Sequence, residues 1–310
     1  MSRSVLVGTR IGATIVALVA CLTATGATAA SSTTSPGPPG AAATPPSAAV
    51  LPGPLSFVRN LDLECFQAPS STAPPFPVIT TQHLNPVLAG LPTETHVVGP
   101  RQQVCMPVAK NNVIPPAGVL DFVRWVDLAC YQITGTAVNF PLGLRHLNPV
   151  LSSLPAKQSA ILVPEQLCLP VIKNNVGPPT TEIFNLVRYI DLKCYRVGNT
   201  NPLNVGLQLT QLNPVVTGIP PGQVGVTNAR QLCVPVRKNG QAIPADVLNI
   251  VRWVDLEKYD TTQHLVPLTT LTLRHINPLL ATVPQETVQF RLGDQLMLPV
   301  AKNNMIPPGP

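Results

Sequence analysis

Residues 254–260 read VDLEKYD, and this short phrase occurs four times along the chain. The other copies are LDLECFQ at 61–67, VDLACYQ at 126–132 and IDLKCYR at 190–196. Apolar and other side chains alternate along each copy, and a period of two with one apolar face is typical of a half-buried strand. We therefore expect a strand to open each of four similar stretches, of which only the last carries Lys258 where the others carry a cysteine.

The repetition extends over the chain from residue 55 onwards. Val-Arg recurs 64 or 65 residues apart, Asn-Pro lies near the middle of each stretch, and a closing phrase such as PVAKNN at 107–112 ends it. A fixed period of this kind predicts a tandem array. The expected repeats are 55–116, 117–180, 181–244 and 245–310.

Each stretch predicts the same short elements. The alternation that marks the opening strand begins at Arg124 in the second copy, and a Pro/Thr-rich loop and a further short strand follow. In the phrase NPVLSSLP, Asn148 is a good N-cap, Pro149 suits the first helical position and Pro155 ends a helix of about two turns. Two more strands and an Asn-Asn or Asn-Gly turn complete the unit. We expect a β-rich α+β fold with strands dominant, made of four tandem modules of about 64 residues, each with short strands and one short helix.

The cysteines predict how the modules are stapled. Each of the first three repeats has one cysteine in its opening strand and one in its closing strand, whereas the fourth has Lys258 and Met297 at the two positions. Joint loss is expected for disulfide partners, because losing one removes the reason to keep the other. The predicted disulfides are Cys65–Cys105, Cys130–Cys168 and Cys194–Cys233. In the fourth repeat, we expect the stem of Lys258 to snorkel and Met297 to fill the gap.

The first 29 residues have the three parts of a secretory signal peptide. Arg3 and Arg10 precede an apolar run that ends at the A-x-A site ATA, residues 27–29. That run is too short for a comfortable membrane span, so we expect no transmembrane segment in the mature chain. Residues 30–54, rich in Pro, Ala, Ser and Thr, follow as a semi-rigid linker.

A second interpretation of the N-terminus stays open. The letters LVAC, which end at Cys21, resemble a bacterial lipobox, in which Cys21 would be lipidated and the protein held at the membrane surface by a lipid anchor. Both interpretations place the mature chain outside the cytoplasm, extracellular or in the cell envelope, where disulfides persist.

Motifs that would indicate an enzyme are missing from the sequence. There is no GxSxG, SxxK, HExxH or CxxC pattern. His83, His146 and His275 each precede an Asn-Pro by two residues, and we interpret them as polar residues near a helix start rather than metal ligands. The net charge of +6 is spread along the chain and is too diffuse to indicate nucleic acid binding. We expect no catalytic residue, metal site or cofactor, and no enzymatic activity.

The face of the opening strand opposite the cysteines suggests a binding surface. An aromatic–acid–aromatic stripe on that face would stack on a sugar ring or dock a peptide. The other interpretation is that this face packs against a helix or the next repeat. The stripe consists of Trp125, Asp127, Tyr131, Tyr189, Asp191, Tyr195, Trp253, Asp255 and Tyr259.

The combination of V-R-[WY]-[VI]-D-L-x-C-Y, L-N-P-V and C-x-P-V-x-K-N resembles tandem repeats in secreted proteins of actinobacteria, a family of unknown function. The resemblance covers residues 55–308 and implies no activity. We expect a secreted, non-enzymatic binding or scaffolding protein that meets an unknown ligand at or outside the cell envelope. The alternatives are an envelope protein anchored through lipidated Cys21, and an extracellular hydrolase with one specialised repeat.

Overall fold

Strands make up most of the regular structure, which we describe from a computed structural model over residues 49–309. The expected dominance of strands is confirmed, and so is the presence of three disulfides. The predicted signal peptide, Cys21 and most of the predicted linker lie outside the described residues. The strands are β1 (Leu63–Gln67), β2 (Ile79–His83), β3 (Glu94–His96), β4 (Arg101–Lys110), β5 (Leu128–Gln132), β6 (Phe140–His146), β7 (Lys157–Lys173), β8 (Leu192–Val197), β9 (Pro202–Gln211), β10 (Gly222–Lys238), β11 (Leu256–His275) and β12 (Glu286–Lys302).

A short α-helix precedes the opening strand of each stretch. The helices are α1 (Pro54–Val58), α2 (Ala117–Val123), α3 (Thr181–Val187) and α4 (Ala245–Val251). The expectation that the opening strand begins at Arg124 is wrong, because Arg124 is the C-cap of α2 and the strand begins at Leu128. Val119, Phe122 and Val123 are buried at helical spacing, a signal that the strand-like alternation after them obscured.

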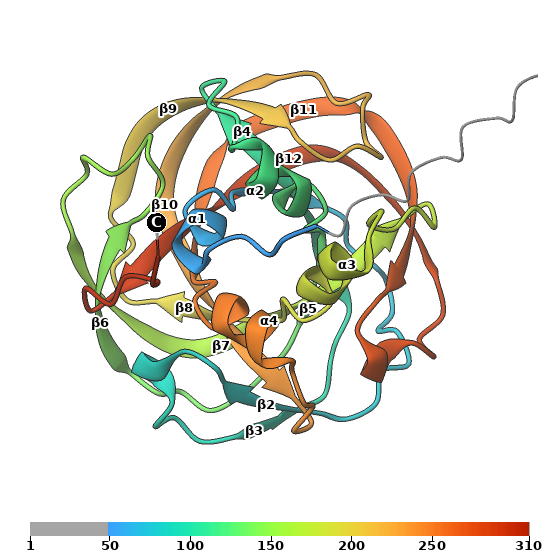
Figure 1. The fold of residues 1–310 in the computed structure, drawn as a ribbon, viewed down its shortest axis with the longest axis horizontal. Helices are drawn as coiled ribbons and strands as arrows, with labels where there is room; N and C mark the ends of the chain where they lie inside the picture. The colour runs from blue at the N-terminus through green and yellow to red at the C-terminus, as the bar shows by residue number, and fades with distance from the viewer. Residues whose placement is uncertain (1–48, 310) are drawn as a thin grey trace, which may run out of the picture. The chain divides into compact units, whose positions relative to one another are not determined.

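Eight strand segments pair into a closed ring. In order around it are β1, β4, β5, β7, β8, β10, β11 and β12, which pairs with β1 again, and every pairing is antiparallel. In Figure 1 the four helices lie around the middle of this compact unit and the strands curve around them. Each helix contacts the next, and α4 contacts α1, so the helices follow the same circular order.

The helices close one end of the ring. One hydrophobic cluster contains buried residues of all four helices together with Leu63, Leu128, Leu192 and Leu256 from the opening strands. These leucines are the first ring residues after each helix, and their burial against the helical side chains excludes water from that end. The helices therefore close one end of the ring. The other end lies away from the helices, beyond the residues that follow these leucines along each strand.

The remaining strand segments lie outside the ring and connect distant parts of the chain. Each predicted repeat adds its second strand to the closing strand of the repeat two places away. The pairings are β2 with β10, β6 with β12, β9 with β4, and the last residues of β11 with β7. Pairing in this manner interlocks segments that are far apart in sequence, so the described residues form one compact unit.

The Asn-Pro phrase forms a shorter helix than expected. Pro86–Leu88 and Pro278–Leu280 are single 3-10 turns, and Asn85 Oδ1 accepts a hydrogen bond from the Val87 backbone N–H as an N-cap does. A proline follows each turn within a few residues and cannot continue a helix. The turns after the closing lysines use left-handed asparagines, as expected; Asn111 has a φ of 50°.

None of the helices between residues 49 and 309 is both long enough and apolar enough to cross a membrane.

Candidate functional site

The inside of the ring is arranged in levels. Alternate residues of a strand point the same way, so Leu63, Cys65 and Gln67 of β1 succeed one another from the helical end outwards. The second level contains the cysteine positions, which face each other across paired strands. The pairs are Cys65 with Cys105, Cys130 with Cys168, Cys194 with Cys233, and Lys258 with Met297.

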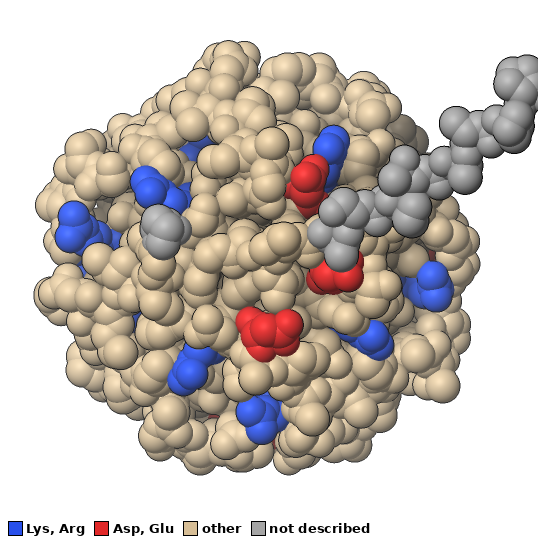
Figure 2. Space-filling view, viewed as in Figure 1, with Lys and Arg blue, Asp and Glu red and all other residues tan. Residues whose placement is uncertain are grey.

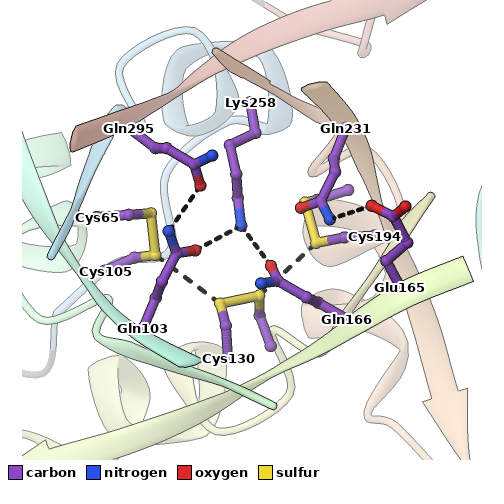
Figure 3. The surroundings of a disulfide bond; sticks show 12 residues. Cys65, Gln103, Cys105, Cys130, Glu165, Gln166, Cys194, Gln231, Lys258 and Gln295 are labelled. Carbon is purple, nitrogen blue, oxygen red and sulfur yellow. Dashed lines mark hydrogen bonds between the residues drawn. A yellow bond between two sulfur atoms is a disulfide. The ribbon is translucent and has the colours of Figure 1, made fainter. Parts of the chain in front are cut away.

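All three disulfides join the cysteines that the sequence pairs. Their sequence separations are 40, 38 and 39 residues, and every one of the six cysteines is fully buried. Neighbouring disulfides touch, because Cys105 Sγ lies 3.8 Å from Cys130 Sγ and Cys168 Sγ lies 3.6 Å from Cys194 Sγ. We call these six cysteines with Met297 the sulfur belt; Figure 3 shows part of it.

Lys258 interrupts the sulfur belt. The expectation that its side chain snorkels to solvent is wrong, since Lys258 is fully buried, while Met297 fills the opposite position as expected. Lys258 Nζ donates to Gln103 Oε1 at 3.0 Å and to Gln166 Oε1 at 2.6 Å (Figure 3). These amide oxygens satisfy the amine inside the ring, so it does not extend to water.

Burial changes the acid–base behaviour of Lys258. Removal from water lowers its pKa to about 7, and the more distant charges of Asp294, Glu165 and Asp260 oppose this shift. Among the described residues, no carboxylate forms a salt bridge with it; its two hydrogen-bond acceptors are neutral amides. Near neutral pH a large fraction of the Lys258 side chains therefore carries an uncharged amine.

Four glutamines form the third level. Each precedes a residue of the sulfur belt by two positions on a closing strand, in the pattern Q-x-C or Q-x-M, and so faces the same way. They are Gln103, Gln166, Gln231 and Gln295.

Hydrogen bonds link this glutamine level to its surroundings (Figure 3). Gln103 Nε2 donates to Gln295 Oε1 at 2.6 Å, and Gln231 Nε2 donates to Glu165 Oε2 at 2.8 Å. Gln231 Oε1 is buried and has no hydrogen-bond partner among the described residues. The level is thus a polar floor with unused acceptor capacity.

A cavity of about 530 Å³ opens over these glutamines at the end of the ring away from the helices. Every residue that lines it is polar or charged, and we call it the polar mouth. The lining consists of Gln67, Gln102, Gln103, Glu165, Gln166, Arg196, Thr200, Arg230, Gln231, Asp294 and Gln295. Arg196 and Arg230 are exposed side chains at its rim. Burial raises the pKa of Asp294, whose Oδ1 has no hydrogen-bond partner within residues 49–309.

The predicted binding stripe does not form one accessible surface. In each copy the aspartate and the tyrosine that ends the stripe are buried. The first aromatic residue of each copy, Trp125, Tyr189 or Trp253, is half-buried and packs against the helical cluster. The face opposite the cysteines is buried because the outer strands cover it, which alternation along a strand cannot reveal. The buried members are Asp127, Tyr131, Asp191, Tyr195, Asp255 and Tyr259.

The aspartates instead form four equivalent buried ion pairs, each with the lysine of a closing phrase. An asparagine from another repeat also donates to each carboxylate; Asn85 Nδ2 donates to Asp255 Oδ2 at 2.7 Å. Burial raises the pKa of each carboxyl and lowers that of each ammonium, and the opposite charge in contact opposes both shifts. The sets are Asp62–Lys110–Asn148, Asp127–Lys173–Asn213, Asp191–Lys238–Asn277 and Asp255–Lys302–Asn85.

The histidines pair with the stripe tyrosines. His83 Nε2 lies 2.9 Å from Tyr195 OH, and the same contact joins His146 to Tyr259 and His275 to Tyr131. Burial lowers the pKa of His146 to about 4, so its imidazole is neutral near pH 7. Within residues 49–309, no group of three His, Cys, Asp or Glu residues could hold a metal ion.

Where the histidine is missing, the tyrosine is missing too. Gln211 occupies the histidine position in the third repeat and Phe66 the tyrosine position in the first, and Gln211 Nε2 donates to Glu64 Oε2 at 3.1 Å instead. Strands β9 and β4 bring these two repeats together. This joint replacement is visible in the sequence and could have revealed the contact between repeats two places apart.

The polar mouth was not predicted, although two signals for it are present in the sequence: the recurrent glutamine before each belt position and the single lysine within the belt. Comparison with protein-family models found no match, and neither did comparison with curated proteins or with solved structures.

Proposed function

We propose that this protein is a secreted, non-enzymatic binding protein that holds a hydroxyl-rich ligand, such as a saccharide, in the polar mouth. The observation that carries the proposal is the lining of a cavity of about 530 Å³ entirely by polar and charged side chains. We further propose that the chain consists of four tandem modules with the boundaries expected from the sequence, related to the secreted actinobacterial repeats. The recurrence of one glutamine before each belt position supports this modular arrangement.

The chemistry of the lining suits hydroxyl groups. A glutamine amide offers two N–H donors and a carbonyl acceptor, so it can meet a hydroxyl in either role. Arg196 and Arg230 add donors at the rim, and the unpartnered Gln231 Oε1 and Asp294 Oδ1 supply acceptors. Buried polar atoms of this kind normally have partners, and a cavity of this volume lies within the range of roughly 300–1,000 Å³ typical of small-ligand sites.

Charge on the helical side offers no competing site for an anionic polymer. Figure 2, viewed from the side of the helices, shows blue residues spaced around a mostly uncharged surface, with a few red residues nearer its middle. A nucleic-acid-binding face would need a cluster of basic residues. This face therefore supports no nucleic acid partner.

Secretion is supported by the disulfides, since three buried disulfides in one compact unit are typical of proteins from oxidising compartments. Mass spectrometry of the mature N-terminus decides the mode of attachment. A chain that begins at Ala30 indicates free secretion, and a diacylated Cys21 indicates a lipid anchor.

The function is tested by calorimetry and a saccharide array with the purified protein. Arg196→Ala combined with Arg230→Ala should weaken binding at least tenfold without changing the melting temperature, because both side chains are more than half exposed. The matched control is Arg145→Ala combined with Arg274→Ala, two exposed arginines outside the polar mouth. Failure of the native protein to bind any saccharide would overturn the proposal, and release of new reducing ends would favour the hydrolase alternative.

A further inference from the structure

We propose that Lys258 is a carbonyl-reactive amine and that the polar mouth captures aldehyde- or ketone-bearing ligands by forming an imine at Lys258 Nζ. The inference rests on the proposed function and names the ligand class of the same site. It makes capture covalent and reversible, and it distinguishes aldoses and other carbonyl compounds from polyols of the same size.

Lys258 differs from every other buried lysine of the ring. Each of the others contacts a carboxylate, which holds the ammonium form in place: Lys110, Lys173, Lys238 and Lys302 contact an aspartate, and Lys193 contacts Glu94. Lys258 is equally buried but contacts only amide oxygens. A buried amine without a counter-charge favours its neutral form, which is the nucleophile in additions to carbonyl groups.

Two glutamines connect Lys258 Nζ to the polar mouth. Their amide oxygens, Gln103 Oε1 and Gln166 Oε1, accept hydrogen bonds from Nζ at 3.0 and 2.6 Å, and both side chains also line the polar mouth. Figure 3 shows these glutamines reaching towards the amine from opposite sides. A ligand that enters the mouth reaches Nζ when one glutamine side chain rotates away, and its carbonyl then takes the place of the amide.

The charged groups around the site set its reactivity at neutral pH. Burial lowers the pKa of Lys258 to about 7, opposed by Asp294, Glu165 and Asp260, while Arg196 and Arg230 lie at the rim. About half of such amines are neutral at pH 7, against less than about one in a thousand for a lysine with the ordinary pKa of about 10.4. Lys258 thus has a larger neutral fraction than surface lysines, and this advantage outweighs its lower accessibility.

The reaction balances without any further reagent. The Nζ lone pair adds to the carbonyl carbon, a proton moves from nitrogen to oxygen, and a carbinolamine results. Loss of that oxygen as water, with one proton supplied by an acid, gives the imine; the acid regains a proton as the nitrogen loses its second hydrogen. Asp294 lines the same cavity, and burial raises the pKa of its carboxyl, so we assign it as the proton donor.

The experiment treats the native protein with glycolaldehyde and cyanoborohydride, which reduces an imine to a stable secondary amine, and locates the adducts by peptide mass mapping. We expect Lys258 to be modified at least ten times faster than the partly exposed Lys157, with a rate that is half-maximal near pH 7. Asp294→Asn should slow modification of Lys258 about tenfold and leave Lys157 unaffected. Lys258→Met removes the adduct.

The outcomes separate this inference from the proposed function. Modification of Lys157 while Lys258 stays unmodified would overturn the imine, and saccharide binding at the mouth would then stand alone. Modification of Lys258 without any saccharide binding would keep the reactive amine and remove the saccharide. A matched pair of ligands adds a second readout: an aldose should bind at least tenfold more tightly than its alditol, and equal affinity would also contradict the imine.

Discussion

The second and fourth predicted repeats use equivalent strand positions in different ways. In the second, Cys130 and Cys168 are joined covalently across β5 and β7, whereas in the fourth Lys258 and Met297 face each other across β11 and β12 without a bond. Both pairs are fully buried, and the strands are in register around both of them. A closed ring explains this tolerance, because β11 and β12 are also held by β10 and β1.

The difference also shows that one position of the belt carries an amine in place of a disulfide. The loss of one disulfide leaves the sulfur belt with a single amine, and the glutamines that contact this amine come from the first and second repeats. One departure from the repeat thus creates a site to which several repeats contribute. The buried aspartate–lysine ion pairs, by contrast, are the same in all four predicted repeats.

The largest expected effect concerns that shared feature. Asp127→Ala leaves Lys173 and Asn213 buried without their carboxylate and should lower the free energy of unfolding by about 3–5 kcal/mol. Asp255→Ala in the fourth repeat should cost the same, because its ion pair is equivalent. Guanidinium unfolding of both variants measures this, and a loss below about 1 kcal/mol for Asp255→Ala alone would show that the fourth repeat is held differently.

A fourth disulfide removes the difference between the repeats. Lys258→Cys combined with Met297→Cys places two cysteines at directly paired positions 39 residues apart, as in the third disulfide. The chain-entropy relation predicts stabilisation by about 4 kcal/mol. Denaturant unfolding under oxidising and reducing conditions provides the comparison. Free thiols at both positions in the folded protein would contradict the equivalence of the four pairs.

The pH dependence of stability isolates Lys258. Its pKa is about 7 in the folded protein and near 10.4 in an unfolded chain, so between these values the unfolded state binds a proton that the folded state lacks. The free energy of unfolding should therefore rise with pH, by about 1.4 kcal/mol per pH unit from this group. The free energy of unfolding of the native protein minus that of Lys258→Met should increase from pH 7 to 9 and level off below pH 7. A difference independent of pH would mean an unperturbed amine.

The smallest expected effect concerns the tyrosine–histidine pairs. They are compared with Phe66 and Gln211, which occupy the equivalent positions where no such pair forms. Tyr195→Phe leaves His83 Nε2 without its partner and should cost about 1–2 kcal/mol. Adding His83→Gln reproduces the natural combination of Phe66 and Gln211, and the double variant should be more stable than the sum of the single effects predicts. Additive losses would show that the two positions are not coupled.

The sequence predicts what depends on pairs within a repeat and misses what depends on the ring. The disulfides could be paired because both cysteines disappear together in the fourth repeat. The ion pair of Asp127 with Lys173 lies within one predicted repeat but recurs in all four, so no joint loss reveals it. The hydrogen bond from Asn213 to Asp127 joins two predicted repeats, which meet only in the folded ring. The tyrosines of the stripe alternate as expected, but their exposure depended on outer strands contributed by repeats two places away.

The fate of Lys258 could not be predicted from local pattern for the same reason. A lysine on an apolar strand face usually reaches solvent, and only the glutamines of other repeats allow this one to remain inside. The recurrent glutamine is visible in the sequence, but the sequence does not show that its four copies lie at one site. Local propensity and spacing thus identified the strands. The polar mouth could not be predicted without knowing that these strands close into a ring.

The hydrogen bond from Asn85 to Asp255 joins the first predicted repeat to the last, and equivalent bonds join the other neighbouring predicted repeats. The Leu55 backbone N–H also donates to Pro308 O at 3.3 Å, so the two ends of the described chain lie side by side. Where the polypeptide starts is therefore arbitrary for the finished architecture. A circular permutant opened at the exposed Asn174–Asn175 turn, with a short peptide bridging the original ends, should fold to the same molecule, its polar mouth intact.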